Sequence, residues 1–176
     1  IMPIKQKYLT ILLILILPLS MVAQTSCDTV KYLFLGGLVG IDTTQKIITT
    51  HEVDSMIFNI CYQLPEKNGQ KDCTECYKFN VTKRDQNLRF ISSKSIAYEI
   101  GKSYRVYKFL YDDPNIADEE EMYFYTPEIG IILYTNLGWG GYGRIIDCNN
   151  LAMTQIAFVL TEKIITDEKF YNSWID

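Results

Sequence analysis

The sequence predicts a β-rich α+β fold, an antiparallel sandwich or partly open barrel with a C-terminal helix packed on it. Short runs of β-branched and aromatic residues recur at a spacing of roughly 8–12 residues along most of the chain. Turn residues separate these runs, and no helical pattern lies between them. Only the last part of the chain has apolar residues at helical spacing.

The expected strands follow one another from residue 30 to residue 146. They are rich in β-branched and aromatic residues, and the run 77–82 alternates apolar and polar side chains, as a half-buried strand does. An Asn-Gly pair at 68–69 marks a turn within the polar loop 64–72. The expected strands are 30–35, 47–50, 56–62, 77–82, 88–91, 95–100, 104–111, 122–126, 129–135 and 142–146.

The run 104–111 is apolar on both faces, which predicts a central strand or one whose tyrosine hydroxyls reach the rim of a cavity or of the sheet. The many aromatic residues are compatible with either an apolar void or a filled core on the inner side of the sheet. The aromatic residues of 98–111 and 123–132 could line an apolar void of about 300 Å³ or more. Alternatively, apolar side chains of the C-terminal helix fill the space against the sheet, and this filled core is the interpretation that we favour because the helical stripe is long. The filling residues would be Met153, Ile156, Leu160 and Ile164.

The helix is expected to begin after Asn150, whose side chain can cap it. Its apolar stripe comprises Met153, Ile156, Ala157, Leu160 and Ile164. Thr166 is expected to cap a second short helix, with Asp167 and Glu168 in its first turn.

The first 23 residues have the order of a cleavable signal peptide. Two lysines at positions 5 and 7 precede an apolar run over 8–19, and Ala23 is the best candidate for the residue before the cut. The apolar core is shorter than the roughly 20 residues that a membrane span needs, although an uncleaved anchor stays an alternative. The prediction is therefore a signal peptide over 1–23 and a single β-rich domain over 24–176, without a transmembrane segment in the mature chain.

The net charge of the mature chain argues against a nucleic-acid partner. The whole sequence has 17 basic and 21 acidic residues, and the signal peptide removes two lysines, so 15 basic residues remain against 21 acidic ones, a net of −6. Nucleic-acid binding requires Lys and Arg to neutralise phosphates.

The five cysteines predict disulfides, because an exported protein matures in an oxidising compartment. The candidates are Cys61, Cys73, Cys76 and Cys148. One cysteine is left over, and Cys27 lies close enough to the predicted cut for lipidation to be considered. The residues before Cys27 lack the apolar residue that a lipoprotein signal carries, which disfavours a lipid anchor.

Cys73 and Cys76 also have the spacing of a thiol oxidoreductase motif. Such a motif requires a helix N-terminus after it to lower the thiol pKa, and here a strand follows. Zinc would need further ligands from Cys61 and Cys148, which an oxidising compartment disfavours. A disulfide that closes the loop is the favoured interpretation.

No catalytic residue, metal site or cofactor site is predicted. His51 is the only histidine, and no nucleophile motif accompanies it. Residues 112–121 carry six carboxylates, but they lack the ligand pattern and turn glycine of a calcium-binding loop. We interpret this segment as a solvated acidic loop.

The glycine-rich turn 138–143 places two aromatic residues in one turn. Trp139 and Tyr142 are possible contacts for a sugar or another partner, while packing over the end of the barrel is the interpretation that we favour.

Residues 123–132 (YFYTPEIGII), within the hairpin 122–135, combine aromatic residues, Pro, Gly and paired aliphatic residues. This pattern resembles a hairpin in small exported bacterial domains of unknown function that are built as half-barrels. The resemblance implies an envelope-associated β fold and assigns no functional residue.

The sequence therefore predicts an exported protein, periplasmic or extracellular, with attachment to the cell envelope left open. Its expected role is non-enzymatic, either binding or envelope structure, with a protein, a glycan or a small apolar ligand as partner. The alternatives are a barrel that carries a small apolar ligand or lipid and a thiol oxidoreductase that uses Cys73 and Cys76.

Overall fold

A computed structural model describes residues 27–36, 40–64, 74–83 and 87–173. The predicted signal peptide, its cleavage site and Cys73 lie outside these ranges. No helix in the described ranges is long and apolar enough to cross a membrane. The strands are β1 (Thr29–Leu35), β2 (Asp42–Val53), β3 (Ile57–Gln63), β4 (Thr74–Asn80), β5 (Leu88–Glu99), β6 (Lys102–Tyr111), β7 (Glu121–Thr126), β8 (Gly130–Asn136) and β9 (Tyr142–Asp147), and they are followed by the helices α2 (Leu151–Thr166) and α3 (Glu168–Asn172).

All nine strands belong to one antiparallel sheet, which confirms the predicted fold class. Their order is β4-β3-β2-β1-β9-β8-β7-β6-β5, so β4 and β5 are the two edges and the sheet does not close. The central pairing joins β1 to β9, the first strand to the last. Every other neighbouring pair is consecutive along the chain.

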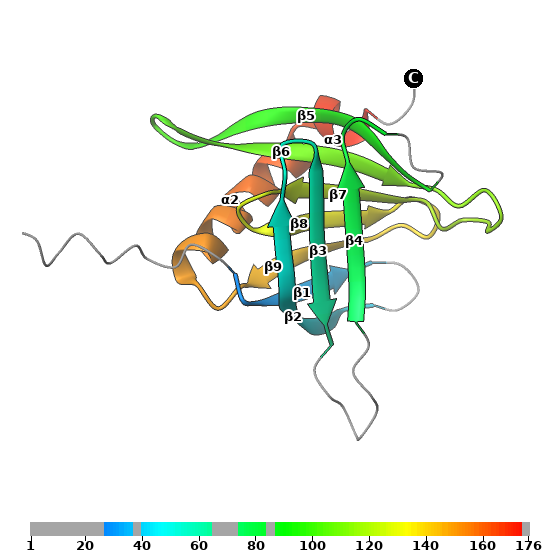
Figure 1. The fold of residues 1–176 in the computed structure, drawn as a ribbon, viewed down its shortest axis with the longest axis horizontal. Coiled ribbons are helices and arrows are strands. Elements are labelled where there is room, and N and C mark those ends of the chain that lie inside the picture. The colour runs from blue at the N-terminus through cyan, green and yellow to red at the C-terminus, as the bar shows by residue number, and fades with distance from the viewer. Residues whose placement is uncertain (1–26, 37–39, 65–73, 84–86, 174–176) are drawn as a thin grey trace, which may run out of the picture.

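The sheet curls so that its β2–β4 part crosses over the β6–β8 part (Figure 1). Aromatic side chains fill the space between the two parts. Phe58 of β3 lies 4.8 Å from Tyr107 and 4.9 Å from Tyr125, measured between ring centroids. Phe79 of β4 lies 4.8 Å from Phe109. The concave side of the sheet is therefore an aromatic core rather than an open cup.

Helix α2 covers the opposite, convex face of the β5–β9 part (Figure 1). Asn150 caps it as predicted, because its side chain accepts a hydrogen bond from the Met153 N–H. The predicted apolar stripe is buried; its inward residues are Met153, Ile156, Ala157, Leu160, Thr161 and Ile164. The molecule thus has three layers: β2–β4, β5–β9 and the helices.

The cap of the second helix differs from the prediction. Asp167, not Thr166, caps α3, and its side chain accepts from the Phe170 N–H at 3.1 Å. Thr166 belongs to the last turn of α2, where its hydroxyl donates to the Glu162 carbonyl at 2.8 Å. Bonding back to the preceding turn is the usual alternative for a threonine inside a helix, and it removes Thr166 as a cap.

Two strands are longer than predicted. The runs 88–91 and 95–100 are one strand, β5, because the polar residues between them stay paired with β6 across a bulge. Strand β2 extends over Asp42–Val53, where only 47–50 was expected. Most of its side chains are exposed, so its backbone pairing is not accompanied by an apolar pattern that would reveal it.

Candidate functional site

Five tyrosines from five strands form a closed ring at one end of the concave side. They are Tyr32, Tyr62, Tyr77, Tyr123 and Tyr134, from β1, β3, β4, β7 and β8. In that order, successive ring centroids lie 6.3, 5.9, 5.8 and 6.1 Å apart. The ring closes between Tyr134 and Tyr32 at 6.4 Å. We call these five residues the tyrosine ring.

Strand register places these side chains together. Tyr123 and Tyr134 face each other across β7 and β8, and Tyr134 lies opposite Gly143 of β9. A Cβ at position 143 would lie only 2.3 Å from the Tyr134 ring, so the glycine leaves room for the tyrosine. Tyr62 pairs with Glu75 across β3 and β4, and Tyr77 follows two residues later on the same face.

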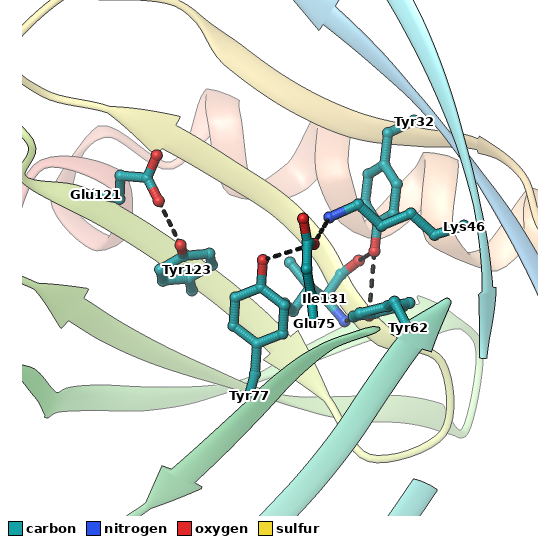
Figure 2. A network of polar contacts seen from close by, with 8 residues as sticks. All are labelled: Tyr32, Lys46, Tyr62, Glu75, Tyr77, Glu121, Tyr123 and Ile131. Atoms are coloured by element: carbon teal, nitrogen blue, oxygen red, sulfur yellow. Dashed lines mark hydrogen bonds and ion pairs between the residues drawn. The ribbon is translucent and has the colours of Figure 1, made fainter. Parts of the chain in front are cut away.

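The hydroxyls of the ring are tied into the sheet (Figure 2). The Tyr32 hydroxyl donates to the Ile131 carbonyl at 2.8 Å and lies 3.2 Å from the Tyr62 hydroxyl. The Tyr62 hydroxyl accepts from the Ile131 N–H at 3.4 Å. Both residues are buried, so these bonds satisfy hydroxyls that solvent does not reach.

Three charged side chains border the ring. Lys46 of β2 forms an ion pair with Glu75, and the Tyr77 hydroxyl donates to the same carboxylate at 3.3 Å. On the other side, the Tyr123 hydroxyl donates to Glu121. Figure 2 shows the Lys46–Glu75 pair and Glu121 at opposite ends of this network. One lysine and two carboxylates leave the site with a net negative charge.

Burial keeps the ring hydroxyls protonated. It raises the pKa of Tyr62 to about 12, although the hydrogen bonds from Tyr32 and Ile131 lower it in part. Burial likewise raises the pKa of Tyr32 well above its ordinary value. Burial and then the nearby Glu121 carboxylate raise the pKa values of Tyr123 and Tyr134. These side chains are neutral hydrogen-bond donors near pH 7, not bases.

The ring encloses a small cavity and borders a larger cleft. The cavity has about 110 Å³ and is lined by the tyrosine ring together with Lys46, Glu121 and Ile131. The cleft has about 390 Å³, and its lining is mostly apolar. It includes Phe34, Leu35 and Tyr142 together with Gly36, Gly40, Gly140 and Gly141. Tyr134 lines both spaces. A third cleft of about 660 Å³ shares Tyr77, Glu121 and Tyr123 with the cavity.

The aromatic residues of 98–111 and 123–132 do not line a single large void. Phe109, Phe124 and Tyr125 are fully buried, and they pack against other aromatic rings. The inner stripe of α2 is buried against the convex face, as the filled-core interpretation requires. The cavity within the tyrosine ring lies away from the helix, and a separate apolar cleft of about 400 Å³ lies against the outer side of α2, where Tyr98, Ile145 and Phe158 line it.

The two aromatic residues of the glycine-rich turn have different surroundings. Tyr142 is half-buried and lines the apolar cleft. Trp139 is 60% exposed and does not line that cleft. The structure brings Tyr142 to the site and leaves Trp139 on the surface.

The cysteines form two pairs. Cys61 bonds to Cys76 across β3 and β4, next to Glu75 and Tyr77 of the site. Cys148 bonds to Cys27, the cysteine that the sequence interpretation had left unpaired. Both sulfurs of this second pair are buried.

These pairings bear on the other hypotheses for the cysteines. Cys76 is bonded to Cys61, so the pairing uses one half of the predicted oxidoreductase motif for a cross-strand link. Cys61 and Cys148, the expected additional zinc ligands, are each bonded to another cysteine. The described residues contain no group of three or more Cys, His, Asp or Glu side chains that could hold a metal ion.

The single histidine lies at the other end of the aromatic core. His51 Nε2 is 2.8 Å from the Tyr125 hydroxyl, and the two rings meet edge to face. Burial lowers the pKa of His51, and the Glu128 carboxylate partly opposes this shift. His51 is therefore part of the packing between β2 and β7.

The acidic loop is internally bonded, and its last carboxylate belongs to the site. Glu119 accepts a hydrogen bond from the Asp113 N–H at 2.6 Å, and Asp113 accepts from Asn115. Glu121, the end of the loop and the start of β7, lines the cavity. The sequence interpretation treated all six carboxylates as solvated and missed this one.

Sequence reasoning also missed Lys108, a fully buried lysine in β6. Its ammonium donates to the carbonyls of Phe170, Tyr171 and Ser173 at 2.7, 2.8 and 3.2 Å. Burial lowers the pKa of Lys108 to about 8. A lysine between Tyr107 and Phe109 in an apolar strand is the signal that could have drawn attention to it.

Comparisons of the chain with protein-family models, with curated proteins and with solved structures found no match. The candidate site therefore rests on its own geometry.

Proposed function

We propose that this chain is an exported, non-enzymatic binding protein that holds a small ligand in the tyrosine ring and the adjoining apolar cleft. The observation that carries the proposal is the shared wall of the two spaces: Tyr134 lines both the ring cavity and the cleft. A ligand with an apolar part and a polar end would fit such a pair of spaces. Ligand sites are commonly apolar pockets with a few well-placed polar groups.

Export is supported by two independent features. The first 23 residues have the order of a signal peptide. Four of the five cysteines are bonded in two pairs, and disulfides persist in oxidising compartments.

The polar groups of the site favour binding over catalysis. The ring tyrosines are neutral, and the hydroxyls of Tyr32, Tyr77 and Tyr123 already donate to fixed acceptors. Glu75 is neutralised by Lys46. Such groups orient a ligand, whereas general acid–base catalysis uses a group whose pKa lies near the working pH.

The apolar carrier, a second candidate function, draws support from the same cleft. At about 390 Å³ it exceeds the roughly 300 Å³ at which ligand pockets begin. A ligand that is apolar throughout would occupy the cleft without using the hydroxyls and charges of the ring.

The proposal is tested with N-phenyl-1-naphthylamine, an uncharged probe whose fluorescence rises in apolar surroundings. We expect saturable binding that is lost in Tyr142→Ser, which removes one wall of the cleft. Ile100→Ser is the matched control, because Ile100 is fully exposed at the turn between β5 and β6 and lines neither the cleft nor the ring cavity. Absence of saturable binding, or equal loss in both variants, would overturn the proposal.

A further inference from the structure

We propose that the tyrosine ring binds an organic ammonium group, so that the ligand is an amphiphile with a cationic head in the ring and an apolar tail in the cleft. The inference rests on the proposed function and names the chemical class of the ligand. It follows from the ring geometry, the charge around the ring and the size of the two spaces.

The ring already attracts an ammonium group of the protein itself. The Lys46 Nζ lies 5.5 Å from the ring centroid of Tyr62 and 5.8 Å from that of Tyr77. Both distances are within the range of about 6 Å in which the negative face of an aromatic ring attracts a cation. Walls of several tyrosines are the usual way in which proteins recognise quaternary ammonium groups.

Two carboxylates border the ring, and a third, that of Asp42, lines the apolar cleft. Lys46 neutralises Glu75. Glu121 accepts the Tyr123 hydroxyl and, among the described residues, has no ion-pair partner. Glu121 also ends the acidic segment 112–121, which carries six carboxylates. The lysine that lines the neighbouring third cleft, Lys78, is exposed and therefore screened by solvent. A cation that enters the ring would neutralise Glu121.

The two spaces fit the two parts of such a ligand. The ring cavity of about 110 Å³ is several times the volume that one water molecule needs, about 10–15 Å³. It is much too small for a drug-sized molecule, which occupies at least about 300 Å³. A trimethylammonium group is of suitable size, and the apolar cleft beyond Tyr134 can take a short alkyl chain.

The first test compares choline with 3,3-dimethylbutan-1-ol, which has the same shape and no charge. An NMR titration should show shifts of the ring tyrosines with choline and a dissociation constant at least tenfold weaker for the alcohol. Equal binding of the two compounds would overturn the inference, since the charge would then contribute nothing. Absence of choline binding would overturn it as well.

The second test removes the unpaired charge without changing the shape. Glu121→Gln should weaken choline binding about tenfold and leave binding of N-phenyl-1-naphthylamine unchanged. Glu162→Gln is the control, because Glu162 pairs with Arg144 on the helix side of the sheet. Unchanged choline binding in a folded Glu121→Gln variant would contradict the role of this carboxylate.

Two further probes identify the source of the ammonium group. Dodecyltrimethylammonium below its micelle concentration represents a free cationic amphiphile, and phosphatidylcholine vesicles represent a lipid headgroup. Tighter binding of the amphiphile than of choline supports occupation of both the ring cavity and the cleft. Binding to the vesicles supports a lipid source of the ammonium group. If the uncharged probe binds and choline does not, only the ammonium inference fails; if neither binds, the proposed function fails too.

Discussion

The two faces of the β5–β9 part of the sheet are both covered, but by different chemistry. On the convex face, α2 contributes aliphatic side chains such as Leu160 and Ile164, which are fully buried. On the concave face, the curled β2–β4 part contributes aromatic rings, many of which carry hydroxyl groups. Aliphatic side chains pack without polar requirements, whereas rigid rings with bonded hydroxyls hold a cavity open. The comparison predicts that stability depends mainly on the helix side, whereas the proposed ligand site lies on the tyrosine side.

Removing the disulfide on the helix side should have the largest effect. Cys27 and Cys148 are 121 residues apart, whereas Cys61 and Cys76 on the tyrosine side are 15 apart. Chain entropy then predicts losses in unfolding free energy of about 5 kcal/mol for Cys27→Ser/Cys148→Ser and about 3 kcal/mol for Cys61→Ser/Cys76→Ser. Urea unfolding measures both. A larger loss of unfolding free energy for Cys61→Ser/Cys76→Ser would show that the tyrosine side, not the helix side, contributes more to stability.

Truncation of the helix core should be the next largest effect. Leu160→Ala leaves a cavity beneath α2 and should cost about 3 kcal/mol of unfolding free energy. Tyr77→Phe on the other face removes only the hydroxyl that bonds Glu75 and should cost about 1 kcal/mol. Thermal and urea unfolding of the two variants measure these two losses of unfolding free energy. Equal losses would show that the tyrosine side contributes as much to stability as the helix side.

Alkaline pH should destabilise the tyrosine side. The folded-state pKa of Tyr62 is about 12, above the ordinary value of 10.0, so the folded state holds its proton more tightly than the unfolded state does. The resulting stability, about 3 kcal/mol from this residue, is present below pH 10 and is lost as the pH rises toward 12. Unfolding followed by tyrosinate absorbance measures it. If Tyr62→Phe has the same dependence of stability on pH above pH 10, Tyr62 is not the source of this loss.

Acidification should produce the smallest effect. Burial lowers the pKa of His51 from 6.5, so the folded state binds a proton less readily than the unfolded state. Stability should therefore decrease as the pH falls through 6.5, and the decrease is small because His51 is only half-buried. His51→Gln should have a flatter dependence of melting temperature on pH between neutral and mildly acidic conditions. If His51→Gln has the same dependence of melting temperature on pH as the wild type, other titratable groups cause that dependence.

The sequence was sufficient for most of the fold because local patterns determine it. A run that is apolar on both faces predicted the strand 104–111, and helical spacing predicted α2 with its Asn150 cap. Strand β2 escaped prediction over most of its length because its exposed polar side chains carry no periodic signal. The sequence did not distinguish a sandwich from an open barrel, since the curl of the sheet depends on contacts between distant strands.

The candidate site was largely beyond sequence reasoning for the same reason. The members of the tyrosine ring are spread from Tyr32 to Tyr134, and only strand order and register bring them together. Tyr142, at the edge of the cleft, was anticipated as a ligand contact, and Tyr123 belongs to the segment 123–132 that the void alternative named. The partner of Cys148 was missed because Cys27 is adjacent to it only through the pairing of the first and last strands.

The buried lysine of β6 joins this strand to the short helix α3. Three carbonyl groups of α3 and of the residue after it solvate the Lys108 ammonium, and they belong to Phe170, Tyr171 and Ser173. A buried ammonium without acceptors is unfavourable, so detachment of α3 would leave Lys108 without partners. Docking of the five-residue helix α3 and burial of Lys108 are therefore a single cooperative event.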